Sequence, residues 1–148
     1  MRSMLFTFVL LSLVPVSSIL AGVHVGLAQV DEIEGVTSKA ATLSWETDQR
    51  HPWEFMGGVI KARNDARLSS PRVIFGSVSK RFTWHGWFAQ GGIATTNSDT
   101  EELSRHWQFM TGIGYRYQHL TVSLRHLSNA NTGGRNRGEN LLLLQWGF

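Results

Sequence analysis

Strict alternation of side chains over residues 107–117 most constrains what this chain can fold into. One parity is apolar or aromatic and carries Trp107, Phe109, Thr111, Ile113, Tyr115 and Tyr117. The other parity is small or polar. Because successive side chains of a β-strand point to opposite faces, the segment predicts a strand with one apolar and one polar face. This period of two recurs and predicts eight strands, at about 22–30, 38–48, 53–64, 72–82, 86–97, 105–117, 119–129 and 139–148.

The connections between these strands differ in length, which favours an up-and-down β-barrel. They are short near 48–52, 82–86 and 118, and longer and polar at 31–37, 65–71, 98–104 and 130–138. A soluble barrel hides its apolar parity, whereas an outer-membrane barrel shows it to lipid and keeps polar side chains inside. The polar parity of residues 105–117 includes Arg and Gln, and the last strand, NLLLLQWGF, ends in an aromatic residue. We therefore predict an all-β, eight-stranded antiparallel up-and-down transmembrane β-barrel of the bacterial outer membrane, with a soluble lipid-binding barrel as the alternative.

The first 21 residues have the pattern of a secretory signal peptide. Arg2 precedes an apolar run from Leu5 to Val16, which the small residues Ser17, Ser18 and Ala21 follow. This run is too short for a membrane-spanning helix, which needs roughly 20 apolar residues. We expect residues 1–21 to be removed by cleavage after Ala21, with positions 18 and 28 as alternatives, and residues 22–148 to form the exported barrel.

Charge and composition exclude several classes of partner. The 14 Lys and Arg residues include Arg2, so 13 remain against 11 Asp and Glu, a net charge of about +2 without any basic run. Nucleic acid is therefore not an expected partner. The chain has no cysteine, and five of its histidines are scattered without the spacing of metal ligands, so we expect neither a metal nor another cofactor. These five are His24, His51, His85, His106 and His119. A homodimer is left open.

The apolar face of the predicted strand 119–129 ends in two polar residues. Leu120, Val122 and Leu124 share a parity that continues into His126 and Ser128. Side chains two residues apart on a strand share a face, with Cα atoms about 6.5 Å apart, so an imidazole nitrogen can reach the seryl oxygen. A nucleophile and general base in this relation are what a serine hydrolase requires. The alternative is a pair of polar residues at the headgroup rim, satisfied by water.

The segment RHLSNAN, followed by a glycine-rich loop, NRGEN and an aromatic-terminated last strand, resembles the lipid A 3-O-deacylase (PagL) family. The resemblance implies an eight-stranded outer-membrane esterase that hydrolyses the 3-O-linked acyl chain of lipid A, embedded in the membrane with lipopolysaccharide as its substrate. It also implies Ser128 as the nucleophile and His126 as the general base. Asn129 matches a residue that supports the site or its oxyanion, although asparagine here also suits a turn cap. Asn136 matches a further family position that we expect to be structural.

The third member of the triad is where the chain departs from the family. The resemblance implies a glutamate near the start of the last strand, and the chain offers Glu139 and Asn140. Parity with Leu142 and Phe148 places Asn140 outward and Glu139 inward, unless a bulge at Gly138 reverses them. We expect Asn140 to face the site, and Glu139 remains the alternative third member of the triad.

Two further readings of function stay open beside the lipid A esterase. A non-enzymatic small outer-membrane barrel, acting as an adhesin or structural protein, would bind through its loops. A lipid A acyltransferase would use a phospholipid donor. Arg135 and Arg137 in the adjacent loop could attract lipid A phosphates, although exposed loop arginines are more often simply solvated.

Overall fold

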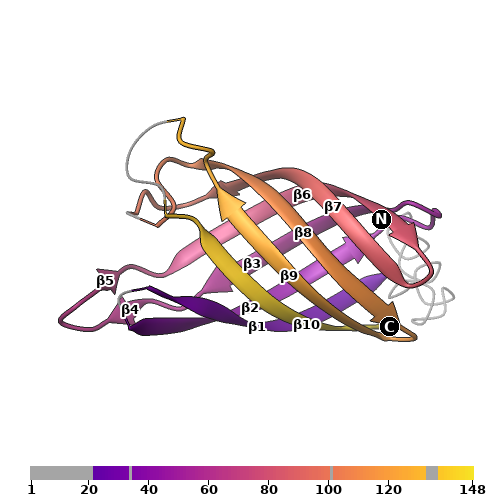
Figure 1. Cartoon of the computed structure of the whole chain (residues 1–148), viewed down its shortest axis with the longest axis horizontal. Coiled ribbons are helices and arrows are strands. Elements are labelled where there is room, and N and C mark those ends of the chain that lie inside the picture. Colours follow the sequence, from indigo (N-terminus) through magenta and orange to yellow (C-terminus); the bar gives the residue numbers. More distant parts are fainter. Residues whose placement is uncertain (1–21, 34, 101, 133–136) are drawn as a thin grey trace, which may run out of the picture.

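The computed structural model describes residues 22–33, 35–100, 102–132 and 137–148, so the expected signal peptide at 1–21 lies outside the described residues. Eight antiparallel strands close into one barrel in the order β1-β10-β9-β8-β7-β6-β3-β2. Figure 1 shows this barrel from the side. Their bounds are Val23–Ile33 (β1), Val36–Glu46 (β2), Trp53–Ile60 (β3), Val73–Trp84 (β6), Trp87–Thr96 (β7), Trp107–Tyr117 (β8), Leu120–Ser128 (β9) and Glu139–Gly147 (β10). The predicted fold class is confirmed. None of the described residues forms a helix long and apolar enough to cross a membrane.

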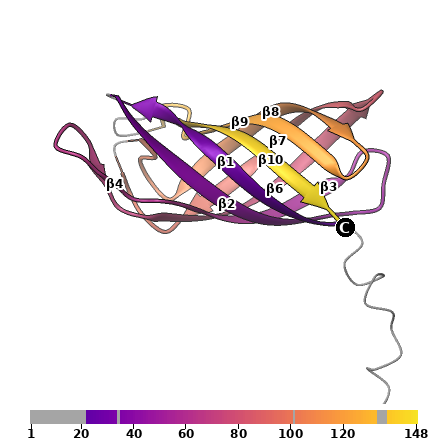
Figure 2. The same ribbon diagram turned by 90° about the horizontal axis from the view of Figure 1, so that it is seen from below.

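The barrel closes where its first and last strands pair. β1 and β10 run side by side in Figure 2, with Val25 opposite Trp146 and Val30 opposite Leu141. Beyond Val30 the register of β1 against β2 shifts, which marks a bulge before Ile33. Closure leaves no unpaired strand edge in the wall, as a barrel in lipid requires.

Two connections differ from the sequence prediction. β1 and β2 extend to Ile33 and Val36, so most of the expected 31–37 loop is strand. The predicted strand 53–64 ends at Ile60, and the chain then forms a small separate hairpin of β4 (Arg63–Asn64) and β5 (Ser69–Ser70). In the barrel wall, β3 pairs with β6 only as far as Ile60 opposite Val73. The polar residues 61–72 therefore project past the rim, where water can satisfy their backbone groups.

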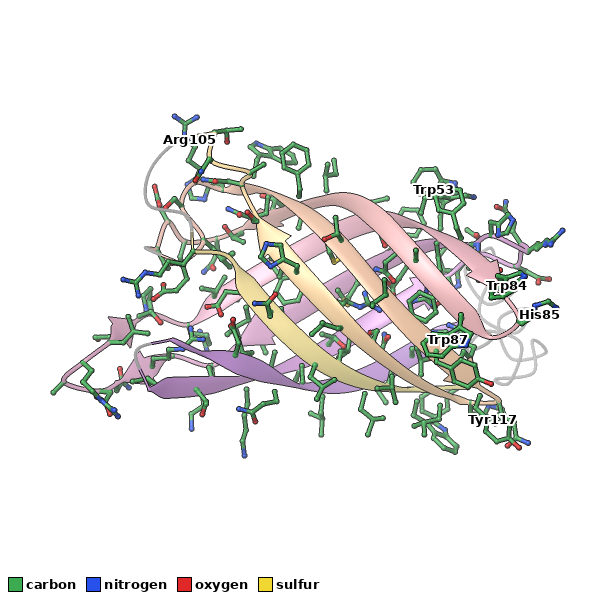
Figure 3. The ribbon with its side chains drawn as sticks, viewed as in Figure 1. Trp53, Trp84, His85, Trp87, Arg105 and Tyr117 are labelled. Carbon is green, nitrogen blue, oxygen red and sulfur yellow. The ribbon has the colours of Figure 1, made fainter. Side chains whose placement is uncertain are left out.

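The two faces of the wall follow the predicted alternation. The outward parity of β8, from Trp107 to Tyr117, is exposed, whereas its inward parity is buried or half-buried. Figure 3 shows Trp53, Trp84, Trp87 and Tyr117 at the end of the short turns, opposite the loop that carries Arg105. Aromatic side chains gathered at one depth are typical of the interfacial girdle of a membrane barrel.

Inside, an ion-pair network crosses the lumen, and an apolar cluster lies towards the loops, where the Arg63–Glu139 ion pair is also buried. Arg125 donates to Glu54 at 2.6 and 3.0 Å, and Arg81 bridges Glu54 and Glu46 at 3.1 and 2.5 Å. Towards the loops, the core is apolar and includes Met56, Ile60, Phe75, Met110, Leu127, Leu141 and Leu143. Leu103, from a connection predicted to be a polar loop, is fully buried and belongs to this core. The lumen is therefore a packed interior rather than a pore.

Candidate active site in the barrel wall

The polar constellation lies where β8, β9 and β10 run side by side. His126 is paired with Asn140 on β10 and with Thr111 on β8, and Ser128 is paired with Phe109. His126, Ser128 and Asn140 are half-buried and lie on the outward parity, as the alternation predicts. On the same face, next to these three residues, lie Leu124 and Leu142. Their side chains are 49% and 57% exposed. A polar group thus interrupts an apolar lipid-facing surface at its loop end.

The side chain of Asn140 connects His126 to a carboxylate on β1. His126 Nδ1 lies 2.8 Å from Asn140 Oδ1, and Asn140 Nδ2 donates to Asp31 Oδ2 at 2.8 Å. The backbone N–H of Asn140 also donates to Asp31 Oδ1, at 3.2 Å. Because an amide oxygen only accepts, Nδ1 carries the imidazole proton, and Nε2 is left as the basic nitrogen. This is the tautomer that a general base for a serine hydroxyl requires.

Gly138 lets the chain pass close to the imidazole as β10 begins. Its φ is +72°, and a Cβ built there would lie 2.5 Å from His126 Cε1 and 2.9 Å from the Leu127 carbonyl oxygen. Glycine alone combines this left-handed conformation with so close an approach. The ring of His126 is therefore packed on one side by main chain and held on another by Asn140.

Ser128 ends β9 and is followed by a tight turn. The backbone N–H of Ala130 donates to Ser128 Oγ at 3.2 Å. Ala130 and Asn131 both have positive φ, 51° and 61°. Two consecutive residues in the left-handed conformation form a tight turn. This conformation costs a non-glycine residue about 1–2 kcal/mol. The strained turn fixes where the hydroxyl sits at the rim of the wall.

Asn129 lies on the opposite face from Ser128 and is 1% exposed. Its Nδ2 donates to the carbonyl oxygen of Ser104 at 2.9 Å, and its Oδ1 accepts the backbone N–H of Asn131 at 3.0 Å. Gln108 donates to the same carbonyl of Ser104 at 3.0 Å. These bonds tie the turn after Ser128 to the neighbouring loop. They use the side chain as the turn cap that the sequence offered as an alternative to an oxyanion donor.

Glu139 lies on the inward face, 2% exposed and opposite Leu127 in the register. Arg63 of β4 donates to both of its carboxylate oxygens, at 2.6 and 3.0 Å. The bulge that would have turned Glu139 outward is not present, because the pairing of β9 with β10 runs without a shift from Glu139 to Trp146. The structure therefore brings Asn140, and not Glu139, to His126. Asn136 and Arg135 lie outside the described residues.

A depression of about 230 Å³ opens beside the imidazole, between Thr111, Ile113, Leu124 and Asn140. A larger, polar cavity of about 470 Å³ lies at the short-turn end, where Arg116 is ion-paired with Glu46 at 2.7 Å. We place the site at the smaller depression, because His126 and Asn140 line it.

Among the residues that the structure describes, no three His, Asp or Glu side chains are grouped to hold a metal ion.

Sequence reasoning missed Asp31 and the packing role of Gly138. The sequence predicts a loop at Asp31, although its parity continues the outward set of Leu27 and Gln29. Extending the alternation through Asp31 would have placed its carboxylate on the wall. The contact of Gly138 with His126 depends on the path of the chain between β9 and β10, which no pattern within either strand reports.

Fold and site together define a small outer-membrane β-barrel that carries His126 and Ser128 on the outward face of its wall. The sequence model of the lipid A 3-O-deacylase (PagL) family matches residues 35–148, and the chain belongs to this family. It is thus an esterase of lipid A, which decides against the adhesin and acyltransferase readings. No curated protein and no solved structure matches the chain.

Proposed function

We propose that the chain deacylates lipid A by a serine-hydrolase mechanism at Ser128 and His126. The supporting observation is the outward imidazole, whose Nδ1 is held by Asn140 at 2.8 Å, two residues before an outward serine. Nε2 accepts the hydroxyl proton as Ser128 Oγ attacks the ester carbonyl carbon. The tetrahedral intermediate collapses to acyl-Ser128, and the protonated imidazole returns the proton to the departing 3-oxygen of the sugar. Water then attacks the acyl-enzyme with His126 as base, releases the fatty acid and restores Ser128.

The position of the site suits a substrate that never leaves the membrane. Leu124 and Leu142 border the polar group on the wall, so an acyl chain in the outer leaflet can reach it by lateral diffusion. The long loops at this end are extracellular in exported barrels, which puts the site at the depth of the ester linkages. The apolar flank also limits water around the reacting atoms.

Within this mechanism Asn140 orients the base, and Asn129 supports the site by holding the turn that follows the nucleophile. Glu139 serves the barrel through its ion pair with Arg63. The oxyanion that develops on the ester carbonyl requires N–H donors near Ser128. We propose the backbone N–H of Ala130, which donates to Ser128 Oγ at 3.2 Å, as one such donor.

The test is the release of one acyl group from lipopolysaccharide by refolded protein in detergent. Mass spectrometry of lipid A should show loss of one 3-hydroxyacyl group, and Ser128→Ala should abolish it. Ser69→Ala, at an exposed position of β5, is the matched control and should keep parental activity. Parental activity in folded Ser128→Ala would rule out the mechanism.

We also propose that residues 1–21 are the export signal. Protein purified from outer membranes should begin at Gly22, as N-terminal sequencing can determine. A chain that retains residue 1 in the outer membrane would contradict this.

A further inference from the structure

Asn140 occupies the place at which a serine triad ordinarily has a carboxylate. In a serine protease, asparagine at that place lowers kcat about 10⁴-fold, because the imidazole then adopts the wrong tautomer. The weakness lies in the symmetry of the amide. Either its oxygen or its NH₂ group can face Nδ1, and only the oxygen selects an imidazole with Nε2 free to accept a proton.

Asp31 removes this ambiguity in the present chain. Both of its carboxylate oxygens face Asn140: Oδ2 accepts from the side-chain Nδ2 at 2.8 Å and Oδ1 from the backbone N–H at 3.2 Å. A carboxylate only accepts, so the NH₂ group of Asn140 must face Asp31 and its oxygen must face His126. Rotating the amide by 180° would set oxygen against carboxylate and break both side-chain hydrogen bonds.

The strand geometry places Asp31 beside Asn140. Asp31 is half-buried on the outward parity of β1, at the register shift between Val30 and Ile33. The neighbouring cation, Arg63, places its guanidinium on both oxygens of Glu139 and meets Asp31 only at the main-chain oxygen, at 3.3 Å. The carboxyl of Glu139 also interacts with the side chain of Asp31, so Asp31 faces both the Asn140 amide and the Glu139–Arg63 ion pair.

We infer that Asp31 is a positioning residue that completes a relay of Ser128, His126, Asn140 and Asp31, in which its carboxylate acts on the base through the amide. This inference rests on the proposed function of Ser128 and His126. Asp31 locks the oxygen of Asn140 towards Nδ1, and its charge polarises the amide when the imidazole becomes positive. It lies before residues 35–148, the part of the chain that the family model matches.

Exchanging the two side chains gives the sharpest test. In Asp31→Asn, either rotamer of the Asn140 amide finds a partner, so we expect kcat to fall at least about 10-fold with KM unchanged. In Asn140→Asp, two carboxylates meet and activity should also fall. In the double variant a carboxylate contacts His126 directly and the amide at position 31 donates to it, so kcat should recover well above both single variants. Asp65→Asn, which removes the same charge from the loop between β4 and β5, is the control and should change nothing.

A spectroscopic measurement tests the relay independently of turnover. In protein labelled with ¹⁵N-histidine, and with the signal assigned by loss in His126→Ala, the parent should show a protonated Nδ1 and an unprotonated Nε2. Asp31→Asn should introduce the opposite tautomer. A parent with the proton on Nε2 overturns the inference, whether or not any variant folds.

The kinetic outcomes are equally decisive. A folded Asp31→Asn variant with parental kcat, or a folded double variant no better than the single ones, overturns the relay. If Ser128→Ala is inactive while the exchange fails, the relay alone is wrong. If Ser128→Ala is active, the proposed function itself is wrong.

Discussion

Replacing Gly138 by alanine should slow deacylation strongly while the barrel stays folded. The added Cβ would lie 2.5 Å from His126 Cε1. Ordinary carbon contacts begin near 3.5 Å, so the ring or the chain must move by about 1 Å. A displacement of this size at a catalytic group can cost about 10²-fold in rate, because the base loses its alignment. Placing a non-glycine residue at φ +72° should also cost about 1–2 kcal/mol of stability.

The measurement is initial-rate deacylation of lipopolysaccharide by mass spectrometry, on protein whose folding is checked by its heat-dependent mobility on gels. Gly76→Ala is the matched control, because a Cβ at Gly76 meets nothing within 4 Å. It should keep the parental kcat. A folded Gly138→Ala variant with parental kcat would refute the argument that Gly138 sets the position of the imidazole.

Three stability predictions follow from the wall and the lumen, each measured by urea unfolding in lipid vesicles with Trp fluorescence. Glu54→Gln leaves the buried Arg125 and Arg81 without their shared carboxylate and should cost about 3–5 kcal/mol, and a neutral result would mean that water hydrates the lumen. Ala130→Gly should stabilise the protein by about 1 kcal/mol through relief of its positive φ, and a loss of stability would show that the turn is unstrained. Ile93→Arg places a charge on the exposed middle of β7 and should cost about 2–4 kcal/mol, whereas tolerance there would contradict a lipid-facing wall.

Parity explains why the faces on which the candidate site residues lie could be predicted from the sequence. A strand turns each side chain to a face fixed by its position, so His126, Ser128 and Asn140 could be assigned to the outer wall and Glu139 to the lumen without any knowledge of contacts. The same rule, with the aromatic end of the chain, predicted a closed membrane barrel of eight strands.

The remaining features depend on relations between strands and loops that alternation does not encode. The contact of Asp31 with Asn140 follows from the register of β1 against β10 at the closure of the barrel and from the bulge after Val30. Leu103 reaches the apolar core from a polar-looking connection, because a single large side chain suffices to fill the loop end of the lumen. The use of the Asn129 amide depends on its partner, the Ser104 carbonyl, which lies in a different connection.

Covalent labelling of the nucleophile tests the central claim most directly. A lipid-like fluorophosphonate should inactivate the enzyme in step with the modification of one residue, and tandem mass spectrometry should place the added mass on Ser128. His126→Ala should slow the labelling, because the imidazole no longer accepts the hydroxyl proton. Complete inactivation with the label on another residue, or labelling of Ser128 with no loss of deacylation, would contradict a serine hydrolase built into the wall of this barrel.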